Sequence, residues 1–270
     1  MVLSAATSIF GRYEFLVRRL HSLTGLAPIG GYMFIHLATN DAIVDGAAAF
    51  QGRVDQIHSI GPTTLFLVEW CFIFLPILFH GLVGLAIVLR GERNVVNYPY
   101  LGNIRYTLQR WTGVIALAFI LWHVFQMHGW FRWEWWRLYV AQPLGGARFD
   151  PQNAAATAAA VLQSSVVVGI AYVVGVTACV YHLANGLWTM GITWGLWTSP
   201  RAQRWANIPC TGFGLVLAIS AVVALWGTLT FPLPARPVAP ESSATATNRP
   251  AFPSVTAPSR AVPQAHQGAM

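Results

Sequence analysis

The stretch PTTLFLVEWCFIFLPILFHGLVGLAIVL, residues 62–89, carries one carboxylate, Glu69, and one histidine, His80, in an otherwise apolar run. About 20 apolar residues in helical conformation cross the hydrocarbon core of a bilayer. A helix satisfies all of its own backbone hydrogen bonds, which a lipid environment cannot do for it. The stretch therefore predicts a membrane-spanning helix.

Outward from this stretch, comparable apolar runs lie at 23–40, 111–130, 161–198 and 208–231. The 270-residue chain is 55% hydrophobic and only 9% charged, which is unlike a soluble domain. We therefore expect an all-α membrane protein with five transmembrane helices in one domain, 1–231. The segment 232–270 is rich in Pro, Ala, Ser and Thr and predicts a disordered tail.

The net charge of +7 comes from arginines that collect between the apolar runs. If five spans alternate, one side of the membrane holds most of them: Arg12, Arg18, Arg19, Arg90, Arg93, Arg105, Arg110, Arg201 and Arg204. The positive-inside rule makes that side cytoplasmic, so the N-terminus is cytoplasmic and the C-terminus extracytoplasmic. Because the charge is explained by orientation in lipid, no nucleic-acid partner is expected.

A weak internal repeat relates the first two spans to the third and fourth. Thr24-Gly25 and Thr112-Gly113 open the first and third spans, and a histidine follows each glycine by 11 and 10 residues. The second and fourth spans share an aromatic residue followed by His-x-x-x-Gly-Leu. The repeat predicts a four-helix core with one intramembrane histidine per helix and a fifth helix outside it.

The four histidines sort into two levels when the helical rise of about 1.5 Å per residue is used to convert position into depth. Measured from the outer ends of the spans, His36 lies about 6 Å deep, His123 about 10 Å, His80 about 26 Å and His182 about 27 Å. Haem iron accepts one imidazole on each face. We therefore pair His36 with His123 (the outer pair) and His80 with His182 (the inner pair) as axial ligands of two haems.

Other interpretations remain open from the residues alone. Each histidine could be a polar residue hydrogen-bonded to a neighbouring helix, and a zinc or proton transporter also uses intramembrane histidines. Such transporters usually add carboxylates near the midplane, whereas here Glu69 alone lies clearly within an apolar run. Small residues that could admit a flat macrocycle, or only pack helices, are Gly30, Gly31, Gly84 and Gly186.

Several segments resemble one family, the di-haem cytochrome b subunit of Bacillus-type succinate:menaquinone oxidoreductase (succinate dehydrogenase, complex II). They are RRLHSLTG (18–25), FLP (74–76), LQRWTG (108–113), WHV (122–124), HLANGLW (182–188) and TWG (193–195). The resemblance runs over about residues 12 to 230 and leaves out the loop 130–160 and the tail. It implies the same four ligands with the same pairing, and a bacterial inner-membrane location.

The resemblance also implies partners and a reaction. A flavoprotein subunit oxidises succinate, an iron-sulfur subunit relays the electrons, and the membrane subunit passes them through two haem b groups to menaquinone. The chain has no nucleotide fingerprint and no cysteine cluster, so it has no catalytic residue toward succinate of its own. Related fumarate reductases carry a glutamate two residues before the inner ligand of the fourth core helix, where this chain has Val180.

Two places are candidates for the quinone site. At the outer level, Glu69 with Asn40 and Asp41 could exchange a proton with a quinone oxygen. At the inner level, Arg19, His21 and Ser22 could bind a quinone carbonyl or the haem propionates. An alternative function is a di-haem anchor for another quinone-linked dehydrogenase, such as a fumarate reductase, hydrogenase or formate dehydrogenase. A structural anchor without haem is a further alternative, which a visible spectrum would test.

Overall fold

The computed structural model describes residues 2–92 and 95–233, and over these residues the chain is built from helices and their connections, without strands. Four helical segments are long and apolar enough to cross a membrane. They are Pro62–Arg90, Leu101–His128, Val166–Thr193 and Pro200–Thr230. The fold is therefore an all-α membrane protein. The predicted tail lies outside the described residues, apart from its first two positions.

The predicted first span, 23–40, is not one of these four. It falls across three elements in sequence: α1 (Val2–Thr24), the π-helical η1 (Gly25–Gly30) and α2 (Gly31–Asp41). Pro28 lies inside η1 and has no N–H to donate, and its ring would clash in a regular α-helix, so the turn widens around it. A fifth membrane span thus remains a prediction.

The stretch 62–89 also contains a π-helical segment. The chain runs through α4 (Pro62–Val68), η3 (Glu69–Phe74) and α5 (Leu75–Arg90) without leaving helical conformation. Pro76 is the second residue of α5, just after the end of η3, whereas Pro28 lies within η1. In both places a proline lies in or near a π-helical segment that precedes one of the four histidines.

The predicted span 161–198 contains α9 (Val166–Thr193), a candidate membrane span that is shorter than the prediction at both ends. α8 (Ala154–Leu162) ends just inside the start of the predicted range, and a short break separates it from α9. In the break, Gln163 donates hydrogen bonds to the carbonyls of Thr228 and Phe231 at 2.9 and 3.0 Å. Ser165 then caps α9 by accepting from the N–H of Val168. Averaged hydropathy hides such a polar break.

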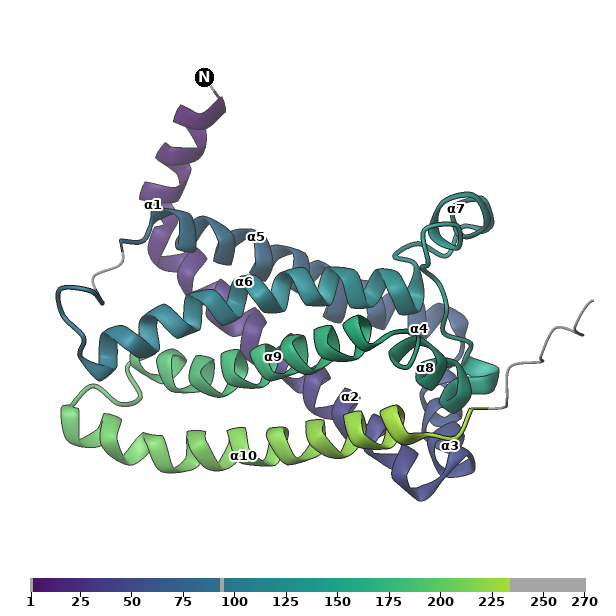
Figure 1. Ribbon diagram of the computed structural model, residues 1–270. Coiled ribbons are helices and arrows are strands. Elements are labelled where there is room, and N and C mark those ends of the chain that lie inside the picture. The colour runs from purple at the N-terminus through teal and green to yellow at the C-terminus, as the bar shows by residue number, and fades with distance from the viewer. Residues whose placement is uncertain (1, 93–94, 234–270) are drawn as a thin grey trace, which may run out of the picture. The chain divides into compact units, whose positions relative to one another are not determined.

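The remaining long helices are α6 (Leu101–His128) and α10 (Pro200–Thr230). Figure 1 shows α6, α9 and α10 running side by side, with α1 and α2 crossing them obliquely. α9 lies between α6 and α10 and packs against both. α2, α9 and α10 share an apolar cluster of Leu37, Val180, Leu183, Leu217 and Ala221. This apolar contact therefore holds together α2 and α9, which carry His36 and His182, with α10.

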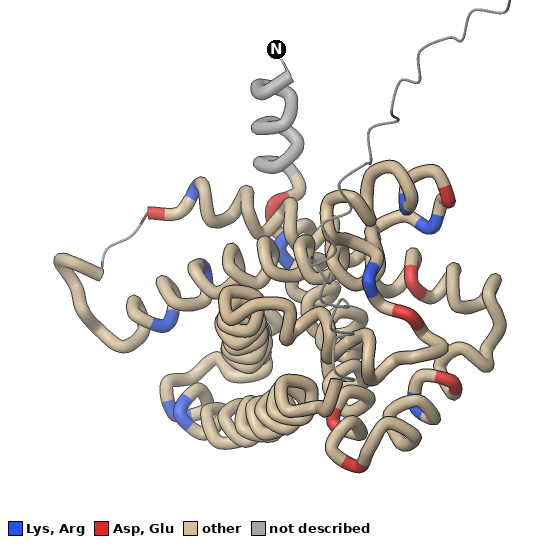
Figure 2. The backbone as a smooth tube through the Cα atoms, turned by 45° about the vertical axis from the view of Figure 1, so that its right-hand side comes forward, with Lys and Arg blue, Asp and Glu red and all other residues tan. Residues whose placement is uncertain are grey.

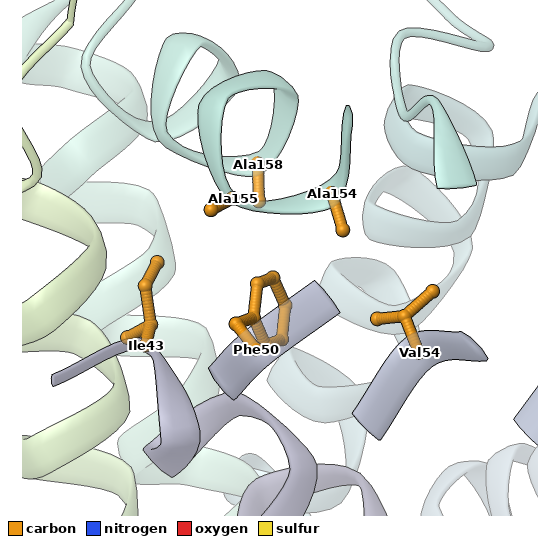
Figure 3. Close-up of a cluster of buried hydrophobic side chains, with 6 residues drawn as sticks. All are labelled: Ile43, Phe50, Val54, Ala154, Ala155 and Ala158. Atoms are coloured by element: carbon orange, nitrogen blue, oxygen red, sulfur yellow. The ribbon is translucent and has the colours of Figure 1, made fainter. Parts of the chain in front are cut away.

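One end of the bundle is closed by short helices. They are η2 (Ala42–Asp45), α3 (Ala47–His58), η5 (Pro151–Asn153) and α8. Phe50 and Val54 of α3 pack against the small residues Ala154, Ala155 and Ala158, as Figure 3 shows. The Gln51 amide donates to the carbonyl of Pro151 at 2.6 Å and accepts from the N–H of Ala154 at 3.1 Å. This contact is polar as well as apolar, so it fixes the register of the two segments.

A short helical segment rich in aromatic residues projects from the same end of the bundle (Figure 1). It comprises α7 (Glu134–Trp136) and the π-helical η4 (Arg137–Ala141). Trp133, Trp135 and Tyr139 are all more than half exposed. Exposed amphipathic rings of this kind favour the boundary between lipid and water.

The charged residues are unevenly distributed along the bundle (Figure 2). Basic positions gather where α6 begins and where α9 connects to α10, and acidic positions gather toward α3, α4 and α7. Glu14 and Glu92 are the acidic exceptions at the basic end. The basic end of the bundle is the end that the positive-inside rule places in the cytoplasm. The orientation of the chain in the membrane remains a prediction.

Candidate functional site

The four histidines of the sequence repeat lie opposite one another in two pairs. His36 of α2 faces His123 of α6, with ring centroids 5.9 Å apart and planes at 73°. His80 of α5 faces His182 of α9, with centroids 6.0 Å apart and planes at 85°. The structure thus brings together the same residues that helical depth paired, each pair joining two different helices.

The separation within each pair suits one metal ion between two rings. A metal–imidazole bond is about 2 Å long, so two rings on opposite sides of one ion have centroids about 6 Å apart. Both observed separations match this value. Neither pair is stacked in parallel, and the same separations and angles are also those of an edge-to-face contact between two rings.

The inner pair has ring nitrogens oriented for metal binding. Nδ1 of His80 lies 2.8 Å from the carbonyl oxygen of His21, and Nδ1 of His182 lies 3.0 Å from that of Gln109. A carbonyl oxygen only accepts, so each Nδ1 carries the proton and each Nε2 keeps its lone pair. Histidines that bind metals are oriented by such a hydrogen bond from the other nitrogen.

The Thr-Gly pairs of the sequence repeat build these two contacts. A Cβ on Gly25 would clash with the ring of His80, and one on Gly113 would clash with the ring of His182. Only glycine therefore leaves room for the imidazole at each position. Gly25 and Gly113 were recognised in the sequence as part of an internal repeat. Their close approach to the imidazole rings of His80 and His182 was not predicted.

The threonines of the repeat lie beside the same carbonyls. The Thr24 hydroxyl is shared between the carbonyls of Leu20 at 2.9 Å and His21 at 3.0 Å. The Thr112 hydroxyl donates mainly to the carbonyl of Leu108 at 2.7 Å and lies 3.3 Å from that of Gln109. A threonine hydroxyl therefore lies beside each carbonyl that accepts from an inner histidine. The repeat therefore places equivalent groups, a backbone carbonyl and a glycine, beside each of the two inner rings.

A polar network extends from His182 toward the basic end of the bundle. The Gln109 amide donates to the carbonyl of His182 at 3.1 Å and accepts from Asn185 at 2.7 Å. Arg105 donates to Asn185 at 2.9 Å and to Asn207 at 2.8 Å, and its guanidinium lies 3.8 Å from the ring centroid of Trp188. The network joins α6, α9 and α10 and places a cation near the inner level.

The outer pair is supported differently. Nδ1 of His123 lies 3.1 Å from the hydroxyl of Tyr172, which donates to the Gln126 amide oxygen at 2.9 Å. On the other side, Tyr32 stacks on His36 with centroids 5.4 Å apart. Sequence reasoning missed Tyr172 and Gln126. A signal existed, because a tyrosine hydroxyl and a glutamine within apolar spans both need a hydrogen-bond partner.

The inner candidates Arg19, His21 and Ser22 occupy different environments. The His21 ring stacks directly on His80, with centroids 4.0 Å apart and planes at 7°. The Arg19 guanidinium lies over Phe15, and its buried Nε has no hydrogen-bond partner among the described residues. Ser22 is half-buried beside them in α1.

Two further donors that the sequence did not single out lie at the same end of the bundle. Arg110 Nη1 and Thr107 Oγ1 are buried and lack a hydrogen-bond partner within the described part of the chain. The Arg110 guanidinium is held over Tyr106, 3.8 Å from the ring centroid. Buried donors without an acceptor are rare in folded proteins, and they point to an acceptor that the chain itself does not supply.

The outer quinone candidates bond to three separate partners and do not form one cluster. Glu69 accepts from Arg132 at 2.6 and 2.8 Å, with a side chain that is 15% exposed. Asn40 donates to the carbonyl of His36 at 2.7 Å. Asp41 accepts from Ser220 of α10.

The glycines chosen from the sequence do not border the facing rings of either pair. A Cβ on Gly30 would meet Leu183, one on Gly84 would meet His21, and one on Gly186 would meet Gln109. A Cβ on Gly31 would meet nothing within 4 Å. Gly30, Gly84 and Gly186 therefore each lie against a side chain of a neighbouring helix, and a role in admitting a macrocycle stays a prediction for all four glycines.

A zinc site finds no support in the described residues, because nowhere among them do three His, Cys, Asp or Glu side chains gather in a way that could hold a metal ion. Structural and catalytic zinc sites use at least three protein ligands. Two ligands on opposite sides are instead the arrangement of bis-imidazole haem.

Comparison with known proteins identifies the family of the chain. No family model matches the chain. The chain is 35% identical over 195 residues to the succinate dehydrogenase cytochrome b558 subunit of Bacillus subtilis strain 168. The match covers 72% of this chain and 87% of that protein. Identity at this level across most of the relative establishes common descent, and the chain therefore belongs to the family of succinate dehydrogenase cytochrome b subunits.

Proposed function

We propose that the chain is the membrane anchor of a succinate dehydrogenase and holds two haem b groups, one between His36 and His123 and one between His80 and His182. In this role it passes electrons from the iron-sulfur subunit to menaquinone. The observation that carries the proposal is the pair of facing imidazoles at each of two levels, with ring separations of 5.9 and 6.0 Å.

The residues present fit the haem group. Each pair offers two imidazoles from different helices, and the inner rings keep Nε2 free for iron because Nδ1 donates to a carbonyl. When bound, haem supplies a one-electron carrier whose potential the surrounding protein tunes. Two protein ligands per iron leave no coordination position for oxygen, which suits electron transfer.

The buried donors at the basic end support binding of the inner propionates. Arg19 Nε, Arg110 Nη1 and Thr107 Oγ1 have no hydrogen-bond acceptor in the described chain. A carboxylate accepts strongly from a guanidinium and satisfies such donors. We assign Arg19, the candidate from the sequence, and Arg110, which the structure adds, to this role.

The basic end is also where we place the soluble partners. Arg201 and Arg204 are exposed at the start of α10, and the connection from α5 to α6 lies at the same end. The network through Arg105 joins this end to His182. An iron-sulfur subunit docked here, with the flavoprotein beyond it, would deliver electrons next to the inner pair, with the N-terminus of the chain on the same, cytoplasmic side.

For menaquinone we favour the outer level, with Glu69 as the group that exchanges a proton with the quinone. Its carboxylate is mostly shielded yet lies in a span, where an ionisable residue is a functional candidate. The inner candidate His21 is already occupied by stacking on His80, which makes it less available to a quinone. Arg132, whose side chain is 45% exposed, contacts both Glu69 and His128 and so joins them to the surface.

Val180 supports the direction of succinate oxidation. The side chain is 8% exposed and packs in the apolar cluster with Leu37, Leu183 and Leu217. Fumarate reductases that resemble this subunit carry a glutamate at this position, and here an apolar cluster fills the space in its place.

The test is purification of the complex through a tag on this chain. We expect the flavoprotein and iron-sulfur subunits to copurify, about two haems per chain, and reduction of a menaquinone analogue by succinate. A colourless chain would refute haem binding, and about one haem per chain would leave one histidine pair without a role. Copurification of a hydrogenase or formate dehydrogenase instead would refute the assignment to succinate dehydrogenase.

A further inference from the structure

The supports of the outer and inner histidines differ in chemical kind. Both inner rings donate from Nδ1 to a backbone carbonyl, which is fixed by its helix and has no proton of its own. His123 instead contacts the hydroxyl of Tyr172, a group that can either donate or accept. Which of the two groups donates in the His123–Tyr172 hydrogen bond therefore depends on the other hydrogen-bond partner of the tyrosine hydroxyl.

Gln126 is that other partner and settles which group donates. The Tyr172 hydroxyl lies 2.9 Å from the Gln126 amide oxygen, which can only accept, so the tyrosine proton points to Gln126. The Tyr172 oxygen then accepts from Nδ1–H of His123. This arrangement leaves Nε2 of His123 with its lone pair. The opposite direction, with Tyr172 donating to Nδ1, would place the proton on Nε2 and prevent iron binding.

The three side chains are held in place by their surroundings. Tyr172 is 3% exposed and Gln126 is 6% exposed. Phe119 stacks on His123 with centroids 5.6 Å apart and contacts Tyr172 edge to face at 5.4 Å. A Cβ on Gly175 would clash with Phe119, so glycine there makes room for this ring.

We propose that Tyr172 and Gln126 are positioning residues that fix the tautomer and orientation of His123 and thereby tune the outer haem alone. The inference rests on the proposed function, because it takes His123 as a haem ligand. Its basis is the pair of side-chain hydrogen bonds from His123 through Tyr172 to Gln126, whereas Nδ1 of each inner ring bonds to a backbone carbonyl.

The direction of the effect follows from the hydrogen bond. An acceptor at Nδ1 makes the imidazole a stronger electron donor, and this favours oxidised iron. Loss of the acceptor therefore favours the reduced haem. Partners of this kind typically change metal binding 10- to 100-fold, so we expect a shift of about tenfold in the ratio of reduced to oxidised outer haem, equivalent to about 59 mV.

The experiment is a redox titration with low-temperature EPR of the intact complex carrying Tyr172→Phe. Phenylalanine keeps the ring and removes only the hydroxyl. We expect both haems to be retained, the outer haem to titrate at a higher potential with a changed g value, and the inner haem to be unaffected. Tyr181→Phe on the same helix, adjacent to His182, is the matched control and should change neither signal in this way.

A second variant separates the hydrogen-bond chain from packing. Gln126→Leu removes the acceptor of the Tyr172 proton and should shift the outer haem in the same direction, by less. If Tyr172→Phe and Gln126→Leu both leave the outer signal at the position of the parent complex, the inference is wrong. If Tyr172→Phe loses haem, an unshifted outer haem in Gln126→Leu likewise refutes it. A parent complex with no outer haem would instead refute the proposed function.

Discussion

The imidazole of His21 stacks in parallel on that of His80, with ring centroids 4.0 Å apart and planes at 7°. Because the backbone carbonyl of His21 also accepts from Nδ1 of His80, one residue contacts both the face and the edge of the same ring. A Cβ on Gly84 would come within 3.1 Å of His21 Nε2, so glycine there helps to accommodate the stack. His21 is thus a neighbour of an inner ligand, whichever other role it has.

Replacing His21 should alter the inner haem without removing it. In His21→Leu the backbone carbonyl that orients His80 remains, but the stacked ring is lost. We expect about two haems per chain, with a changed EPR g value and midpoint potential for the inner haem alone. His58→Leu, in α3 at the other end of the bundle, is the control. Loss of the inner haem from His21→Leu would instead make the side chain indispensable for binding.

Each of the four ligands should be required for one haem. His36→Leu and His123→Leu should each remove the outer haem, and His80→Leu and His182→Leu should each remove the inner one, because a single imidazole loses the second axial bond. Haem content should fall to about one per chain, and the surviving spectrum should be the same within a pair. If His36→Leu and His123→Leu leave different haems behind, the pairing is wrong.

Replacing Gly25 or Gly113 by alanine should prevent binding of the inner haem. A Cβ at Gly25 or Gly113 would overlap the ring of His80 or His182. Gly25→Ala and Gly113→Ala should therefore lose the inner haem and keep the outer one, as read from haem content and the difference spectrum. Gly31→Ala has open space within 4 Å and should retain both haems. Equal haem content in all three variants would show that the helices can move apart.

The pairing of the histidines could be predicted because it depends on the helical rise alone. Position along a span becomes depth, and four histidines then fall on two levels. The apolar runs and the Thr-Gly repeat were also visible, although not the purpose of Gly25 and Gly113, which depends on which ring crosses the neighbouring helix.

What escaped prediction depends on side-chain partners between helices. Tyr172 within an apolar span resembles a core residue until Gln126 is known to face it. Gln163, directly after α8, bonds to carbonyls at and just beyond the end of α10, which lie far away in sequence. The interruption of the first span by η1 follows from Pro28, but the number of residues in the π-helical segment could not be predicted from hydropathy.

Glu69→Gln should slow quinone reduction while both haems remain. A group that transfers a proton typically contributes about 10²- to 10⁴-fold to a rate, so we expect at least about a hundredfold loss of succinate:menaquinone activity, with normal reduction of an artificial acceptor at the soluble subunits. Glu69 also pairs with Arg132, whose side chain is 45% exposed, and such pairs contribute little to stability. Arg132→Gln breaks the same ion pair and keeps the carboxylate, so it should retain most of the activity. If both variants lose activity equally, the ion pair matters and not the proton. If neither does, menaquinone is reduced elsewhere, and Arg19→Gln and Ser22→Ala at the inner level become the variants to measure.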